Sequence, residues 1–120
     1  MKTEKRIFGD FGEKIACKFL ISRGYKIVET NFSTKYGELD IIASKDDELF
    51  FVEVKTRTVK DYINYPENAV DYFKKIKLER TAEIYLNKKR IKRVFYSFSC
   101  LAIIVDNFTN KAKIKFFERI

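Results

Sequence analysis

The segment GELDIIASKDDELFFVEVKTR, residues 37–57, constrains the fold more than any other part of the chain. Apolar residues recur at every second position on both sides of Asp46 and Asp47, and a period of two is typical of β-strands. Acidic residues between two such runs predict a tight turn and therefore a β-hairpin. The turn is either that pair or the four residues 45–48, and both choices produce the same register.

This register places charged residues opposite one another. Asp40 falls opposite Glu53, and Glu38 falls opposite Lys55. Directly opposed side chains have Cβ atoms about 5 Å apart, and like charges at that distance repel each other. Asp40 and Glu53 therefore require either a cation between them or a proton on one of them.

The two faces of the hairpin differ in composition. One face is apolar throughout and is predicted to belong to the core: Leu39, Ile41, Ala43, Phe50, Val52 and Val54. The other face mixes charged residues with Ile42, Leu49 and Phe51, which predict that a helix covers part of it. Carboxylates on that mixed face would then be partly desolvated.

Lys55 follows Glu53 on the mixed face, roughly 7 Å further along the strand. A divalent ion held by hard oxygen ligands can polarise a phosphodiester, while a neighbouring ammonium group orients a water molecule or stabilises developing charge. The alternative interpretation is a solvated sheet face, on which Glu38 and Lys55 form an ion pair and both remaining carboxylates are hydrated. The residue pattern leaves both interpretations open.

The remaining segments predict a mixed α/β domain in which helices pack on a sheet. Apolar residues at helical spacing place Glu13 at the rim of the first helix, and Gly24 supplies its stop. The predicted elements are, in order, a helix over residues 10–23, a strand over 25–32, the two hairpin strands, a helix from Pro66 to about Lys88, and strands over 94–105 and 113–120. The order α-β-β-β-α-β-β thus predicts a single domain over residues 1–120, with a mixed sheet flanked by helices.

The composition limits the classes of function. The 25 Lys and Arg against 17 Asp and Glu give a net charge of +8, which favours a polyanionic partner such as nucleic acid or an anionic membrane surface; a solvated Lys-rich surface is the alternative. Without any His, the chain must rely on carboxylates, lysines or a hard metal ion for chemistry.

No apolar run approaches the roughly 20 residues that cross a bilayer, and no signal peptide is recognisable, so we expect a cytoplasmic protein without a membrane partner. Cys17 and Cys100 are expected to be reduced core residues.

Short motifs spread over nearly the whole chain resemble the YraN-like family of small bacterial proteins. The motifs that carry the resemblance are GE at residues 12–13, GY at 24–25, Asn31, GELDIIA and FVEVKTR in the hairpin, AV followed by Lys74, and YL at 85–86. That family belongs to the PD-(D/E)XK nuclease-like fold, which is similar to restriction endonucleases and archaeal Holliday junction resolvases. The resemblance therefore implies a restriction-endonuclease-like sheet for this chain.

The resemblance also implies roles for individual residues. Asp40 and Glu53 are the implied ligands of Mg²⁺ or Mn²⁺, joined by the main-chain carbonyl of Val54. Lys55 is the implied catalytic lysine, and Glu13 from the first helix is implied to approach the same metal. A fold hosts many functions, so inheritance of the fold is firmer than inheritance of the activity.

The expected function is a divalent-metal-dependent nuclease, or a structure-selective DNA-processing protein, that hydrolyses phosphodiesters. Arg57 and Lys74 are the candidate phosphate contacts, and the expected partner is nucleic acid, DNA in particular. The alternative is a non-catalytic module that retains the nuclease fold and binds nucleic acid or protein. The fold relatives also allow a homodimer, for which no segment of the sequence marks a face.

Overall fold

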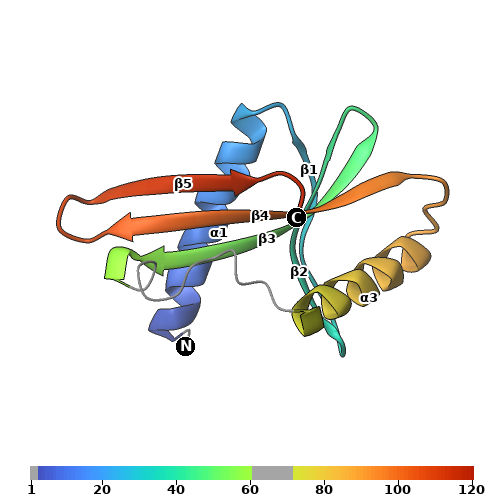
Figure 1. The fold of residues 1–120 in the computed structure, drawn as a ribbon, viewed down its shortest axis with the longest axis horizontal. Helices are drawn as coiled ribbons and strands as arrows, with labels where there is room; N and C mark the ends of the chain where they lie inside the picture. Colours follow the sequence, from blue (N-terminus) through green and yellow to red (C-terminus); the bar gives the residue numbers. More distant parts are fainter. Residues whose placement is uncertain (1–2, 61–71) are drawn as a thin grey trace.

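The computed structural model describes residues 3–60 and 72–120, apart from the side chains of residues 72–74. Its elements are α1 (Glu4–Ser22), β1 (Lys26–Thr34), β2 (Gly37–Lys45), β3 (Glu48–Thr58), α3 (Tyr72–Lys88), β4 (Phe95–Asp106) and β5 (Lys111–Phe117). The five strands form one sheet in sequential order, with β3 and β4 parallel and the other neighbours antiparallel (Figure 1). The predicted α/β class and order of elements are confirmed. The predicted start of the second helix at Pro66 lies outside the described residues.

Helix α1 begins six residues before the predicted start at Asp10. The Thr3 hydroxyl accepts a hydrogen bond from the Arg6 N–H at 3.2 Å and so caps the first turn. The first two turns carry little buried surface, as the 56% exposure of Ile7 shows, so the apolar spacing could not reveal them. The predicted stop is confirmed, because Gly24 adopts a φ of 89° directly after the helix.

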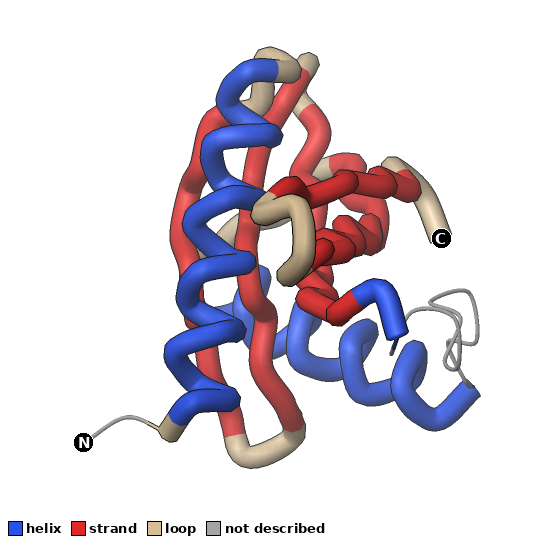
Figure 2. Tube along the Cα trace, turned by 90° about the vertical axis from the view of Figure 1, so that its left-hand side faces the viewer, coloured by secondary structure: helices blue, strands red, loops and turns tan. Residues whose placement is uncertain are grey.

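The two helices cover opposite faces of the sheet. The cluster beneath α1 consists of Ala16, Leu20, Tyr25, Ile41, Ala43, Phe50, Val52, Leu101 and Ile103. The cluster beneath α3 consists of Phe32, Leu39, Ile42, Leu49, Phe51, Ala82 and Tyr85, which confirms the prediction that a helix covers the mixed face of the hairpin. Figure 2 shows α1 lying lengthwise along one face of the sheet. Gly12 permits this approach, because a Cβ there would lie 1.8 Å from Thr56 Oγ1.

The hairpin of β2 and β3 turns at Asp46 and Asp47, whose φ angles of 51° and 63° are those of a type I′ turn. The predicted register is confirmed over its five pairs, which end at Ile41 and Val52. Beyond that pair β2 separates from β3, although β3 remains paired with β4 as far as Thr58. We call this opening, between residues 37–40 of β2 and residues 53–58 of β3, the strand fork.

The alternation of β2 breaks next to the fork. Leu39 was predicted to share the face of Ile41, but it packs in the α3 cluster, so that prediction is wrong. On the neighbouring strand, Asn31 has a φ of 55°, between the pairs Thr30–Ile41 and Phe32–Leu39. A residue in this left-handed conformation interrupts the pleat, and the two strands turn together at this point.

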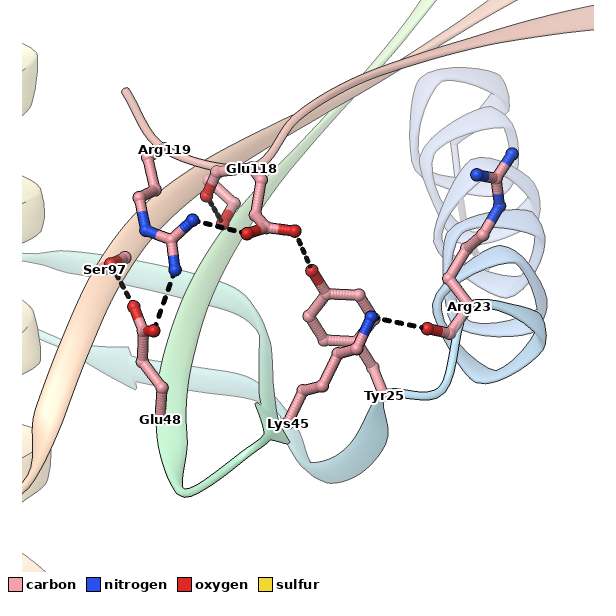
Figure 3. A network of polar contacts seen from close by, with 8 residues as sticks. Arg23, Tyr25, Lys45, Glu48, Ser97, Glu118 and Arg119 are labelled. Carbon is pink, nitrogen blue, oxygen red and sulfur yellow. Dashed lines mark hydrogen bonds and ion pairs between the residues drawn. The ribbon is translucent and has the colours of Figure 1, made fainter.

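The C-terminal residues fasten the sheet to the turn end of the hairpin (Figure 3). The Tyr25 hydroxyl donates a hydrogen bond to Glu118 Oε2 at 2.6 Å. Arg119 Nη2 lies 2.9 Å from Glu48 Oε1, and Ser97 donates to the other oxygen of the same carboxylate. These contacts hold the end of the chain against Glu48 of β3 and against Tyr25, which directly precedes β1.

Two further expectations concern the cysteines and the membrane. Cys17 is half-buried and Cys100 is buried, and neither forms a disulfide within the described residues, as predicted. Neither helix in the described part of the chain combines the length and the apolar character needed to cross a bilayer.

Candidate active site at the strand fork

Asp40 lies where β2 leaves β3, and its side chain bridges the two strands. Asp40 Oδ2 accepts a hydrogen bond from the Val54 N–H at 2.8 Å. This bond occupies a donor that regular strand pairing would otherwise satisfy, and it fixes the orientation of the carboxylate. The Asp40 carboxylate is therefore a positioned group and not a mobile surface charge.

The electrostatic environment of Asp40 is unfavourable for a negative charge. Burial raises the pKa of Asp40 to about 6, and the hydrogen bond from Val54 opposes that rise. The negative charges of Glu53, Glu38 and Glu13 raise it further. The fork thus brings Asp40 within electrostatic range of both acids that were predicted to act with it.

The fork opens into a cavity on each face of the sheet, and Asp40 lines both. The cavity beside α1 has a volume of about 440 Å³ and includes Glu13, Asp40, Val54 and Arg57 in its lining. The cavity beside α3 has a volume of about 270 Å³ and includes Asp40 and Glu53. The predicted pair of acids therefore shares a cavity, although the strand pairing ends one residue before them.

Glu13 lies in the third turn of α1 and lines the α1 cavity together with Asp40. Asn31 Nδ2 donates a hydrogen bond to Glu13 Oε1 at 2.8 Å. Burial raises the pKa of Glu13, while the hydrogen bond from Asn31 lowers it and the charges of Asp10 and Glu38 raise it. The sequence assigns no role to Asn31 beyond its place among the YraN-like motifs, although Asn is a residue type that tolerates a positive φ.

Glu53 and Lys55 occupy the face of β3 that is opposite to Val54. Val54 packs against the α1 cluster, so the alternation of β3 directs Glu53 toward α3, where its Oε2 atom is buried. Lys55 is half-buried and pairs in register with Ala102 of β4. The described lining of neither cavity includes Lys55, so the structure places it beside the acid pair along the strand, outside both cavities.

The predicted phosphate contacts differ in position. Arg57 is half-buried, donates a hydrogen bond from Nη1 to the Thr56 carbonyl at 3.1 Å, and lines the α1 cavity. Lys74 belongs to the first turn of α3, but its side chain lies outside the described residues. Lys77, one turn later on α3, lines the α3 cavity together with Glu53. No pattern in the sequence predicted that Lys77 would line this cavity.

Carboxylate and carbonyl oxygens at the fork are the donors that hard cations prefer. Within residues 3–60 and 75–120, no group of three or more Asp, Glu or Cys side chains is arranged to hold a metal ion. Mg²⁺ usually takes one or two carboxylates and completes its coordination with water and substrate phosphate, so it does not need a larger protein cage. Asp40, Glu53 and the Val54 carbonyl are thus a compatible donor set.

Comparison with known proteins identifies relatives over most of the chain. The model of the uncharacterised protein family UPF0102 matches residues 12–105, a range that contains the whole strand fork. The UPF0102 protein TTE1452 of Caldanaerobacter subterraneus is 38% identical over 88% of this chain and 85% of its own length. The UPF0102 protein of Clostridium tetani is 35% identical over 96% of this chain and 93% of its own. That of Syntrophomonas wolfei is 43% identical over 88% and 91%.

Proposed function

The chain belongs to the uncharacterised protein family UPF0102, the YraN-like group, and we propose that it is a divalent-metal-dependent nuclease with its active centre at the strand fork. The observation that best supports the proposal is the raised pKa of Asp40, caused by burial and by neighbouring carboxylates beside an open cavity. A fold gains no stability from like charges held together in a partly dry site, and such arrangements are common at functional sites.

The residues of the fork divide the chemistry among them. A bound Mg²⁺ or Mn²⁺ would polarise the phosphodiester and lower the pKa of a water molecule. Asp40 is held for this purpose by the Val54 N–H, and Glu53 provides the second carboxylate from the adjacent strand. Lys55, on the same strand face as Glu53, orients the attacking water or stabilises charge on the phosphate.

Glu13 completes the arrangement from the α1 side. The hydrogen bond from Asn31 fixes its carboxylate toward the cavity that Asp40 also lines. This position suits a general base or an outer carboxylate that holds water near the metal. Arg57, in the lining of the same cavity, is placed to neutralise a phosphate that enters there.

The second candidate is a binding module that keeps the nuclease fold and does not cleave. The net charge of +8 favours this function as much as it favours a nuclease. The two candidates differ in what Asp40 does: binding through basic surfaces survives Asp40→Asn, and cleavage does not.

Calorimetric titration with Mn²⁺ tests the proposal without requiring a known substrate. We expect binding to the wild type and its loss in Asp40→Asn. The matched control is Asp47→Asn, the same change at the exposed turn of the same hairpin, where a positive φ suits Asn. Equal Mn²⁺ affinity in all three proteins would contradict a metal site at the fork.

Cleavage is tested next, on duplex, single-stranded and branched DNA and on RNA, in Mg²⁺ and in Mn²⁺. We expect the wild type and Asp47→Asn to cut at least one of these substrates, and Asp40→Asn and Lys55→Met to leave all of them intact. A wild type that binds Mn²⁺ but leaves the whole panel uncut would favour the binding module.

A further inference from the structure

The hairpin of β4 and β5 presents an aromatic ring to solvent at its tip. Phe108 is 99% exposed. The turn that carries it is well defined, because Asp106 Oδ1 accepts hydrogen bonds from the N–H groups of Phe108 at 2.9 Å and of Thr109 at 3.4 Å. Asn110 supports the same turn with a φ of 55°. The ring is therefore held outward by an ordered connection.

Three lysines line one face of the strand that follows this tip. Ile114 and Phe116 of β5 pack against the α1 cluster, so the alternating Lys111, Lys113 and Lys115 occupy the opposite face. Neighbouring lysines along the strand are roughly 7 Å apart. They line a groove of about 630 Å³. Asp106 is the one acid among the described lining residues, and its carboxylate accepts the hydrogen bonds that form the turn.

The strand register continues this row of positive charge toward the fork. Lys115 pairs with Ala102, which pairs with Lys55. Lys113 pairs with Ile104, which pairs with Arg57, but Arg57 also lines the α1 cavity, so Lys55 is the residue of β3 that continues the row on this face. Residues two strands apart in such a row have Cα atoms roughly 10 Å apart. In Figure 1 the β4–β5 hairpin extends past the end of β3, so the basic row leads from the fork to the aromatic tip.

We propose that this hairpin binds an unpaired nucleic-acid strand, with Lys111, Lys113 and Lys115 on its phosphates and Phe108 stacked on a base. The lysines attract a polyanion of any form. The ring favours an unpaired strand, because stacking on one base improves affinity by about 5- to 150-fold. Opening a duplex step to reach a base costs about as much as one stacked ring gains, so the ring adds little to the binding of a duplex.

This inference rests on the proposed function only for the position at which the bound strand would be cut. It adds that the substrate contains an unpaired nucleic-acid strand. An unpaired strand that lies along the basic row passes Lys55 and reaches the fork. Branched and gapped nucleic acids contain such strands, so they would be cut in preference to intact duplex. Binding itself needs neither metal nor cleavage.

The first test measures binding of a labelled single strand of about 12 nucleotides by fluorescence anisotropy, in EDTA and over a range of salt concentrations. The hairpin variant carries Lys111→Gln, Lys113→Gln and Lys115→Gln. The control carries three Lys→Gln changes at exposed residues of α1 and β1, namely Lys14, Lys18 and Lys26. Both variants lose the same charge.

Three lost phosphate contacts should reduce the slope of log K against log salt by about 2 and weaken binding about 100-fold at 0.1 M salt. The control should keep most of the slope. Equal losses in the two variants would mean that the chain binds through its overall charge, and would overturn the proposal. An unchanged slope in the hairpin variant would also overturn it, leaving the lysines the role of protecting an edge strand from pairing.

The second test isolates the ring. Phe108→Ala should weaken single-strand binding at least 5-fold and abolish quenching of 2-aminopurine in the strand. The control is Phe95→Ala, which removes a ring that is 82% exposed at the other end of β4. If Phe108→Ala instead converts a dimer to a monomer in light scattering and leaves DNA binding unchanged, the tip contacts a second copy and the proposal fails.

A blunt duplex with the same sequence completes the test. We expect the wild type to bind the single strand more tightly than the duplex, and the opposite order would refute the preference for an unpaired strand. Because all binding is measured in EDTA, a failure here is distinguishable from a failure of the metal site, which the Mn²⁺ titration of Asp40→Asn decides.

Discussion

Asp40→Asn should stabilise the metal-free protein at neutral pH, although it removes the residue that we place at the centre of the active site. The carboxylate has a pKa of about 6 in the fold, against a usual value of 3.8. That difference corresponds to about 3 kcal/mol of unfavourable free energy once the group is ionised in both states. Since Asp40 is only half-buried, we expect a gain of about 2 kcal/mol. The Asn carbonyl can still accept the hydrogen bond from Val54.

The pH dependence gives this prediction its sign. Between the usual pKa and the raised one, the folded protein holds a proton that the unfolded chain has released, so the contribution of Asp40 to stability falls as the pH rises. The contribution is fully present below about pH 4 and is lost above about pH 6. The advantage of Asp40→Asn over the wild type should therefore be about one third of its full size at pH 4.5 and reach its full size at pH 7.5.

Urea unfolding in EDTA, at several pH values, measures the difference in free energy of unfolding. Asp106→Asn is the control with the opposite sign, because hydrogen bonds from the Phe108 and Thr109 N–H groups lower the pKa of Asp106. Its substitution should destabilise the protein about equally at pH 4.5 and pH 7.5, because the contribution of a carboxyl with a lowered pKa is lost only as the pH falls below the usual value of 3.8. An Asp40→Asn protein that is less stable than the wild type at pH 7.5, or whose advantage is independent of pH, would refute the reasoning. Saturating Mn²⁺ should selectively stabilise the wild type.

Three further predictions concern the contacts that build the fork and its surroundings. Gly12→Ala should cost about 1–3 kcal/mol in urea unfolding, because its Cβ would overlap the Thr56 hydroxyl, and Thr56→Ala in the same chain should recover most of the loss. Tyr25→Phe should cost about 1–2 kcal/mol by leaving Glu118 without the hydroxyl donor, and a denaturation midpoint equal to that of the wild type would contradict this. Asn31→Gly should preserve the positive φ at this position but remove the hydrogen bond that holds the Glu13 carboxylate, so Mn²⁺ binding should weaken. Unchanged Mn²⁺ affinity would mean that Asn31 serves only the backbone conformation.

The sequence predicts the closed end of the β2–β3 hairpin well. Its register follows from local information, namely apolar residues with a period of two on either side of a turn that Asp46 and Asp47 can form. The covering helix is predictable for a similar reason, since Ile42, Leu49 and Phe51 need an apolar partner on their face. These features depend on residues that are close in sequence or share one face.

The open end of the hairpin could not be predicted in the same way. The register arithmetic assumes a regular ladder, whereas the fork depends on Asn31, whose positive φ breaks the pleat of the neighbouring strand. That conformation is accompanied by a hydrogen bond to Glu13, which α1 brings from 18 residues away. The change of face at Leu39 thus accompanies a tertiary contact and follows no pattern within β2.

The same strand separation explains why acids can gather at the fork and why the basic row can reach them. If β2 and β3 remained paired beyond Ile41, a main-chain carbonyl of β2 could accept the hydrogen bond from the Val54 N–H. That N–H would then not be available to the Asp40 carboxylate. Because β3 instead stays paired with β4 as far as Thr58, the strand that carries Glu53 and Lys55 keeps its register with the β4–β5 hairpin. The fork thus leaves one edge of β3 open to the cavities, while pairing at the other edge fixes the distance from Lys55 to the lysines of β5. A nucleic-acid strand bound along those lysines, as we propose, would therefore arrive at a defined position.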